Sequence, residues 1–335
     1  MTILAWGTSL PELQTQGIYN AANGSAYTSA AQLAPYVAEG ILAGRADLCA
    51  ANQPWRLNFT PTADLWFSFY METDSAGGSG AFPPFIVLGG GVELFRLQQA
   101  GGLLLQYHNG TSWQTSGTAI TYVSNVLARF DCHFVVHDTT GTLTVYRDGK
   151  EHTQATFSAG DTLLRGESLM DEIGLGHAFS SGARETYLSA VFVSTTDSRP
   201  IHYAQTAIDG AGAETDWSGA YTDIDEAGGD DADLIQAGTT ADKATYTFAA
   251  LPTALNTGYT VVGVGVSARA AKGDSSPANL QLAARHSTTN GFSGSKALDG
   301  VFGPFQHIFP LNPNGGAAWT FTEADAAEVG VQAIT

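Results

Sequence analysis

Acidic residues offer the first candidates for chemistry. Asp171 and Glu172 are adjacent, and one residue separates Glu214 from Asp216. A retaining glycosidase needs two carboxyl groups about 5 Å apart, but adjacent residues of a strand point to opposite faces of the sheet. The second pair has a suitable spacing, yet it lies in a glycine-rich stretch without a third acid close behind it. GxSxG, HExxH and CxxC motifs are missing as well, so we expect no catalytic residues and no enzymatic activity.

A second group of residues has the chemistry of a sugar site. The stretch QYHNGTSW combines aromatic, imidazole and amide groups in one turn, and YRDG adds a charged pair at a hairpin tip. A sugar needs an aromatic platform for its apolar face and polar groups for its hydroxyls. The candidate carbohydrate-binding residues are Tyr107, His108, Asn109, Trp113, Arg147 and Asp148. The alternative is that the aromatic residues cover the edge of a β-sandwich and that RDG simply makes a good turn.

Clustered acids raise the question of a bound cation. The stretch TDIDEAGGDDADLI holds the candidate metal ligands Asp223, Asp225, Asp230 and Asp231. Calcium prefers such oxygen ligands, but the EF-hand pattern fails, because Ala227 and Leu234 stand at its fifth and twelfth positions. We therefore expect no cofactor, and Ca²⁺ in this acidic stretch stays open as the alternative to a solvated loop.

The charge balance restricts the partners of the chain. The 335 residues include 14 basic and 32 acidic ones, giving a net charge of −18. Nucleic acids and anionic membrane surfaces need a basic footprint, so neither is an expected partner. An apolar run long enough to span a bilayer is missing from the sequence, and its start lacks the features of a secretory signal. We expect the protein to be made in a cytoplasm and not to insert into membranes.

The stretch RFDCHFVVHDTTGTLTVYRDGK, residues 129–150, predicts two strands joined by a tight turn. Its alternation places Phe130, Cys132, Phe134 and Val136 on the core side. Asp131, His133 and His137 fall on the outer side, where we expect the histidines to be exposed and to bind no metal. Cys132 is therefore expected to be a small core residue. Whether it pairs with Cys49, the other cysteine, stays open.

Strand patterns recur along the chain and predict an all-β protein of two blocks. Residues 1–205 are expected to form the first β-sandwich, and residues 243–335 a second, smaller one of jelly-roll type. Between them we predict an acidic join, residues 206–242, with ten acidic residues and no Lys or Arg. In the second block, GYTVVGVGVSARAA is the clearest strand, with Val262, Val264, Val266 and Ala268 on one face.

The first block resembles the concanavalin-A-like (laminin-G) lectin and glucanase superfamily. The resemblance rests on the 129–150 hairpin, on IGLG and on TYLSAVFVSTTDSRP. It implies a concanavalin-A-like β-sandwich, or jelly roll, and a carbohydrate-binding role. The glucanases of that superfamily carry acids spaced Glu-x-Asp-x-x-Glu on one strand, and this sequence has no such triad. The resemblance therefore implies binding more than hydrolysis.

A further resemblance, over most of residues 115–335, is to virion proteins of tailed bacteriophages and gene transfer agents. It rests on WSGAYTDIDEAGGDDADLIQAGTTADKATYTF, VVGVGVSARAAKGDSS and GAAWTFTEADAAEVGVQ. It implies a location in the virion and contacts with other virion proteins. Together with the lectin-like first block and the missing catalytic residues, it leads us to expect a tail fibre, spike or head fibre that attaches to host-surface polysaccharide. The alternatives are a glycan-degrading depolymerase and a purely structural connector or decoration protein. Unprotected edge strands and the symmetry of particles predict a homo-oligomer, with three copies as our expectation.

Overall fold

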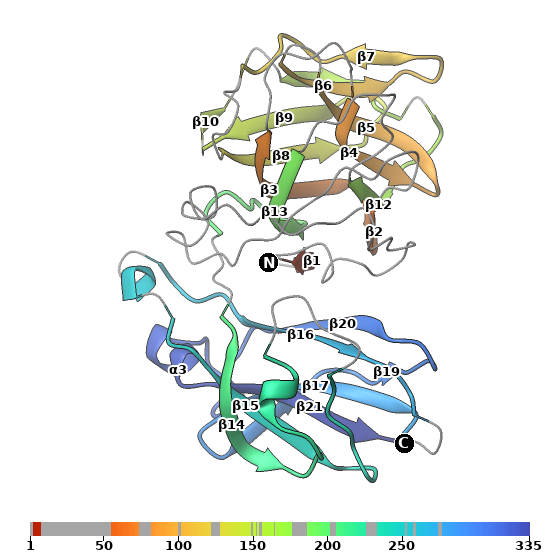
Figure 1. Cartoon of the computed structure of the whole chain (residues 1–335). Coiled ribbons are helices and arrows are strands. Elements are labelled where there is room, and N and C mark those ends of the chain that lie inside the picture. Colours follow the sequence, from red (N-terminus) through yellow and green to blue (C-terminus); the bar gives the residue numbers. More distant parts are fainter. Residues whose placement is uncertain are drawn as a thin grey trace. The chain divides into compact units, whose positions relative to one another are not determined.

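The fold is taken from a computed structural model of the chain. The residues it describes are 3–7, 55–73, 82–99, 102–121, 128–175 (without 149, 152, 154, 155 and 164), 186–201, 206–225 and 233–335 (without 252, 257, 258 and 274–276). They form two compact units, Met1–Tyr203 (unit 1) and Ala204–Thr335 (unit 2), which are labelled by element in Figure 1. Among the helices described, none is long and apolar enough to cross a membrane.

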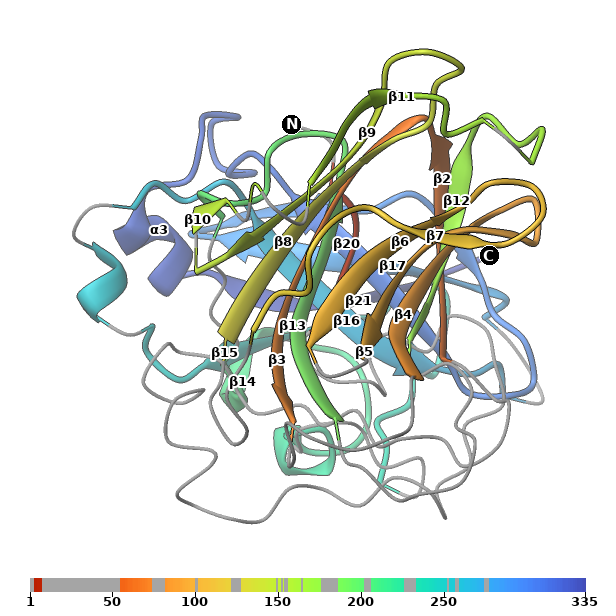
Figure 2. The same ribbon diagram turned by 90° about the horizontal axis from the view of Figure 1, so that it is seen from above.

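Unit 1 consists of two antiparallel sheets, seen as two layers from above in Figure 2. Sheet A runs in the order β1 (Ile3–Gly7), β13 (Thr186–Ser194), β3 (Asp64–Thr73), β8 (Ala128–Val135), β9 (Gly141–Arg147) and β10 (Lys150–Glu151), and β11 (Phe157–Gly160) also pairs with β9. Sheet B runs in the order β2 (Trp55–Thr62), β12 (Met170–Leu175), β4 (Phe82–Gly89), β5 (Val92–Gln99), β6 (Leu103–His108) and β7 (Trp113–Thr115). This is the expected jelly-roll β-sandwich, and the all-β prediction is confirmed.

Aromatic side chains fill the space between the two sheets. Phe67 and Phe69 of β3 lie with their ring centres 4.9 Å and 5.4 Å from that of Phe85, on β4 of the opposite sheet. Phe134 of β8 stacks 5.1 Å from Phe95 of β5. The core prediction for the 129–150 hairpin is confirmed, because its four apolar residues are all buried in this cluster. Burial raises the pKa of the Cys132 thiol well above its usual value, while Cys49 lies outside the described residues.

Unit 2 packs a larger sheet against a two-stranded ribbon. Sheet C runs in the order β14 (Ile208–Thr215), β15 (Lys243–Phe248), β21 (Glu328–Ile334), β17 (Asn279–His286) and β18 (Thr289–Phe292), and β19 (Lys296–Ala297) also pairs with β17. The ribbon consists of β16 (Val264–Ala270) and β20 (Gly303–Phe309). Short helices lie at Tyr221–Asp223 (η3), Thr253–Asn256 (η4) and Phe321–Asp325 (α3). Core residues of β17, the ribbon and Trp319 meet between the layers, so this layered unit is itself a small β-sandwich.

Residues 206–242 differ from the predicted acidic join. Their first strand, β14, pairs with β15 and forms one edge of sheet C. This strand was not predicted, because the segment is rich in acidic residues. In addition, its inward positions include small residues such as Gly210 and Gly212 rather than large apolar ones. The segment therefore belongs to unit 2, and the division of the chain falls between Tyr203 and Ala204.

Sheet C is strongly curled. β14 and β18 stand at opposite ends of its strand order, yet the amide nitrogen of Asn290 on β18 donates to the carboxylate of Glu214 on β14 at 3.0 Å. The backbones of β15 and β21 also approach closely, since a Cβ on Gly330 would overlap the carbonyl oxygen of Ala244. Only glycine fits that position.

Candidate functional site

The outer face of sheet B carries a row of polar side chains over β5, β6 and β7. The strand register places Arg96 opposite Gln106, Gln106 opposite Thr115, and His108 opposite Trp113. Residues that oppose one another across antiparallel strands share a face, and the alternate residues Leu97 and Leu105 lie in the core. The five polar and aromatic side chains therefore gather on one side of three neighbouring strands, which we call the β5–β7 face.

Arg96 organises this face. Its guanidinium carbon lies 4.1 Å from the centre of the Trp113 ring, a cation–π contact that spans β6. Its Nε donates to Gln106 Oε1 at 2.7 Å, and its Nη2 donates to Gln98 Oε1 at 3.0 Å. Gln106 in turn donates from Nε2 to the hydroxyl of Thr115 at 3.3 Å. These hydrogen bonds orient the two amides, and the cation–π contact holds the indole against Arg96.

His108 completes the β5–β7 face in its neutral form. Burial and the nearby charge of Arg165 lower the pKa of the imidazole. Its Nδ1 accepts a hydrogen bond from the backbone N–H of Gly110 at 3.1 Å, so the proton of the neutral ring resides on Nε2. The ring stands edge-on to Trp113 with 5.2 Å between the ring centres.

The predicted sugar-binding residues are distributed over both sheets. His108 and Trp113 lie on the β5–β7 face, whereas Tyr107 points to the opposite side and packs 4.8 Å from Phe157. Asn109 shapes the turn, since its side-chain oxygen accepts from the backbone N–H groups of Thr111 at 3.1 Å and Ser112 at 2.8 Å.

The hairpin tip YRDG belongs to sheet A, at the end of β9. Arg147 donates from Nη1 to the carbonyl oxygen of Thr121 at 2.6 Å. Asp148, with a φ of 49°, accepts from the backbone N–H of Arg129 at 3.0 Å. Both side chains thus hold the tip of the hairpin. Sequence reasoning missed Arg96, Gln98 and Gln106, although the alternation in FRLQQ and LLQYH carries their signal.

Two of the four acidic candidates for a cation, Asp223 and Asp225, lie within the described residues. Asp223 lies in η3, where its carboxylate accepts from the backbone N–H of Ala220 at 2.8 Å. Asp230 and Asp231 lie outside the described residues. Within the described parts of the chain, three or more His, Cys, Asp or Glu side chains nowhere gather as metal ligands would. A Ca²⁺ site therefore remains only an expectation from the sequence.

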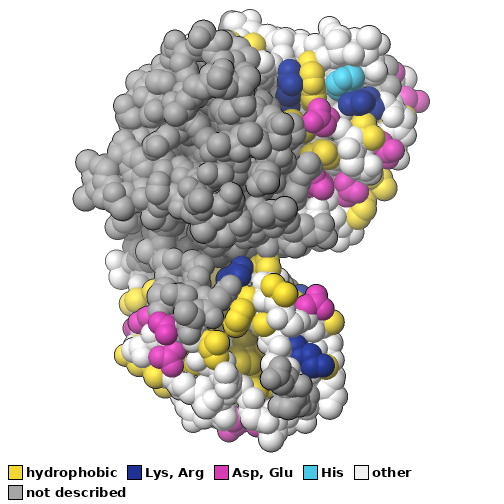
Figure 3. Space-filling model, turned by 45° about the vertical axis from the view of Figure 1, so that its right-hand side comes forward, with side chains coloured by type: hydrophobic (Ala, Val, Ile, Leu, Met, Phe, Trp, Pro, Cys, Tyr) yellow, Lys and Arg dark blue, Asp and Glu magenta, His cyan; other side chains and the backbone are white. Residues whose placement is uncertain are grey.

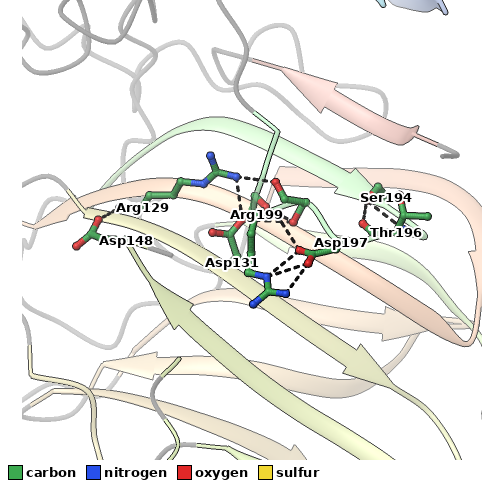
Figure 4. A network of polar contacts seen from close by, with 9 residues as sticks. Arg129, Asp131, Asp148, Ser194, Thr196, Asp197 and Arg199 are labelled. Carbon is green, nitrogen blue, oxygen red and sulfur yellow. Dashed lines mark hydrogen bonds and ion pairs between the residues drawn. The ribbon is translucent and has the colours of Figure 1, made fainter. Parts of the chain in front are cut away.

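A second polar cluster lies on the outer face of sheet A and is drawn in Figure 4. Asp131, whose side chain is 1% exposed, pairs with Arg129 at 2.9 Å. The hydroxyls of Ser68 and Ser198 also bond to its Oδ1, and Arg129 donates to the carbonyl oxygen of Ser198 at 2.8 Å. Asp131 was expected on the outer face, and it is there, but residues 195–201 cover it. We call this segment the strap.

Arg199 holds the strap from its other side. Its guanidinium carbon lies 4.2 Å from the centre of the Tyr146 ring and 5.3 Å from that of Trp66, and its Nε donates to Asp197. Trp66 also stacks on His133 at 4.3 Å, so the expected exposure of His133 is reduced to 23% of its side chain. The charges here are paired with one another. The cluster is therefore a structural latch, and the β5–β7 face is the better candidate site.

Comparisons with known proteins add structural likenesses only. Neither a protein-family model nor a curated protein sequence matches the chain. Similar solved structures include sheep galectin-11 in complex with glycerol, at 15% identity and a TM-score of 0.28, over 42% of this chain and 97% of that one. Another is the carbohydrate recognition domain of Emp46p, at 9% identity and a TM-score of 0.31, over 44% of this chain and 80% of that one.

A third similar structure covers more of the chain. It is the binding domain of botulinum neurotoxin DC in complex with rat synaptotagmin II, at 9% identity and a TM-score of 0.34, over 84% of this chain and 82% of that one. Scores and identities this low say nothing about activity. What the described residues define is the class, an all-β protein whose unit 1 is a jelly-roll sandwich, and its function has to be argued from its own side chains.

Proposed function

We propose that the protein is an attachment protein of a phage-like particle, a tail fibre, spike or head fibre, that binds host-surface polysaccharide without hydrolysing it. The observation that carries the binding proposal is the β5–β7 face, where Arg96, Trp113 and two glutamines are fixed to one another. The particle location is supported by the sequence resemblance alone.

The chemistry of the β5–β7 face suits a sugar chain. Arg96 covers part of the Trp113 ring, and the part of this half-buried ring that stays exposed offers apolar surface to the C–H face of a pyranose, while polar neighbours address its hydroxyls. The groups offered are the Nη1 of Arg96, the Nε2 of Gln98 and the Nε2–H of neutral His108. Because Arg96 and Gln106 are already oriented by hydrogen bonds, binding costs little side-chain entropy.

Glycan binding is tested with the full chain on a glycan array, followed by calorimetry on the best ligand. Trp113→Ala should weaken binding about tenfold or more, in line with the roughly 1–3 kcal/mol that one stacked ring contributes elsewhere. The matched control is Phe292→Ala, which removes an aromatic ring of 37% exposure from unit 2 and should bind like the wild type. If the intact protein binds no glycan, the binding proposal is wrong, and the role of a structural connector or decoration protein is favoured instead.

The particle location has its own test. Antibodies against the chain, used with gold labels on intact particles from the source culture, should decorate the tail or the head surface. Label found only in the soluble fraction would contradict the virion role, whatever the outcome of the glycan measurements.

A hydrolase is the second candidate, and one feature of sheet B favours it. The register places Glu172 of β12 and Glu93 of β5 on opposite sides of Leu88, in one row of the outer face. Two strand spacings separate the two backbones by about 9.6 Å, which is close to the upper end of the roughly 6.5–9.5 Å between the carboxyl groups of inverting glycosidases. Reducing ends released from a bound glycan, and lost in Glu172→Gln, would establish hydrolysis. We expect no release.

A further inference from the structure

Arg96 and Arg165 differ from other arginines in how their charges are bound. Several arginines of the described structure form ion pairs with carboxylates, namely Arg129, Arg147, Arg199 and Arg285. Arg96 instead donates to the neutral amides of Gln98 and Gln106. Arg165 donates to the backbone oxygen of Glu93 at 3.1 Å. Within the described ranges of the chain, neither guanidinium group is bonded to a carboxylate, although the chain has 32 acidic residues.

The charges of these two arginines act together at His108. Burial lowers the pKa of the imidazole most, Arg165 and Arg96 lower it further, and Glu93 opposes them. Charges have such an effect only when they lie close to the ring. Arg96 and His108 also contact the same indole, that of Trp113. In Figure 3, the face of unit 1 that is drawn shows basic side chains beside a histidine and among hydrophobic ones, with acidic ones close by. Positive charge and apolar surface therefore occur together at the β5–β7 face.

Arg96 keeps donors for a ligand. A guanidinium carries five N–H groups, of which one on Nε and one on Nη2 donate to the glutamines. The remaining three, five less two, include both N–H groups of Nη1. This nitrogen is not among the buried atoms that lack a partner in the described structure. Adjacent N–H groups on Nη1 and Nη2 form a fork that matches the two oxygens of a carboxylate.

An anionic ligand uses this fork better than a neutral one. A hydrogen bond between two charged groups is shorter and roughly twice as strong as one between neutral groups. The net charge of −18 opposes an acidic ligand at long range, but charges separated by more than about 8 Å are largely screened at physiological ionic strength. The contacts made at the face therefore decide whether an acidic sugar binds.

We propose that the β5–β7 face selects acidic glycans, and that Arg96 binds the carboxylate of a uronic acid residue in the sugar chain. This inference rests on the proposed glycan binding and specifies its class of sugar. Trp113 contacts the C–H face of the same residue, and the Nε2–H of His108 donates to a neighbouring oxygen. Gln98 and Gln106 keep the fork of Arg96 in place.

The test compares each acidic glycan with a matched neutral form. Oligosaccharides of polygalacturonate, alginate and hyaluronate are measured by calorimetry with the full chain, beside carboxyl-reduced forms in which –CH₂OH replaces the carboxylate. At least one acidic form should bind about tenfold more tightly than its reduced form, as expected for one hydrogen bond to a charged group. Equal affinity for the two forms, or a glycan array with neutral ligands only, would overturn the selectivity and leave glycan binding intact. Binding to no glycan would overturn both.

Variants of Arg96 assign the preference to its side chain. Arg96→Gln should remove the preference for the acidic form, whereas Arg96→Lys, which keeps the charge but loses the fork, should retain part of it. Lys150→Gln is the matched control, since it removes one positive charge from an exposed position on β10 of sheet A and should leave the preference unchanged. Thermal unfolding checks that each variant is folded. A full preference in folded Arg96→Gln would show that another group binds the carboxylate.

A measurement on the unaltered protein locates the carboxylate. A bound acidic glycan should raise the pKa of His108, followed by NMR, because a nearby negative charge favours the imidazolium form. The carboxyl-reduced glycan should shift it less. An acidic glycan that binds without changing the titration of His108 would place its carboxylate away from the β5–β7 face and contradict the proposal.

Discussion

Arg96 and Trp113 are stacked across an intervening strand, with the guanidinium carbon 4.1 Å from the ring centre. Burial lowers the pKa of Arg96 from its usual value, and Glu93 opposes that change. An exposed contact of this type stabilises by about 0.5–1 kcal/mol. Its larger effect is on geometry, because the arginine that covers the indole also orients the amides of Gln98 and Gln106.

Replacing Arg96 should therefore cost more in ligand affinity than in stability. We expect Arg96→Gln to unfold with a free energy reduced by about 1 kcal/mol and to lose about tenfold in glycan affinity, because both glutamines lose their donor. Denaturant unfolding and calorimetry check the two numbers. Arg165→Gln serves as the control, since its guanidinium donates to the backbone oxygen of Glu93 rather than to the glutamines. Equal loss of affinity in both variants would count against an organising role of Arg96.

The latch of sheet A predicts a much larger effect on stability. Asp131→Ala leaves the guanidinium of Arg129, whose side chain is 10% exposed, without its buried partner. Loss of one member of a buried pair costs about 3–5 kcal/mol, and denaturant unfolding should show it. Asp138→Ala, which removes a carboxylate of 68% exposure, should change stability by less than about 1 kcal/mol. Glycan binding of the folded fraction should be unchanged.

The thiol of Cys132 should be unreactive in the folded protein. Burial raises its pKa, and the adjacent charge of Asp131 raises it further, so the reactive thiolate is suppressed. In a Cys49→Ser background, Ellman's reagent should leave native protein unmodified and label one thiol after unfolding in urea. Labelling of the native protein at the rate of the unfolded chain would contradict the burial of this side chain.

His108 should give unit 1 a measurable dependence on pH. Its folded-state pKa lies below the ordinary value, through burial first and Arg165 second, so the folded chain holds the proton less tightly than the unfolded chain. Its effect on stability is absent at high pH and becomes unfavourable as pH falls through about 6.5, the ordinary imidazole value. An NMR titration should find the midpoint of His108 below that value. Arg165→Gln should raise the midpoint, and an unchanged midpoint would exclude the arginine as a cause.

The core of unit 1 could be predicted from the sequence, because it depends on local alternation. Phe130, Cys132 and Phe134 are buried as their spacing indicates, and the pairing of β8 with β9 follows from the turn between them. The same alternation places Asp131 on the outer face, but it cannot show that the side chain of Asp131 is buried on that face. That burial comes from the strap, which is more than 60 residues away in the chain.

The candidate site shows the same limit. His108 and Trp113 lie in one turn and were recognisable from it, whereas Arg96 reaches Trp113 only because β5 pairs with β6 and β6 with β7. Alternation assigns a residue to a face, but pairing of strands decides which faces meet. Strand β14 was not predicted for another reason. Its glycines and alanines fit a closely packed, curled sheet and produce no hydrophobic alternation in the sequence.

Under the proposed attachment role, the strap has a mechanical consequence. Between the boundary of the two units and strand β13, the chain first meets Arg199 in its aromatic contacts and then Ser198 on Arg129 and Asp131. The partners of Ser198 and Arg199 lie on β3, β8 and β9. We therefore expect a force transmitted along the chain from unit 2 to be shared among three strands of sheet A before it acts on β13 alone.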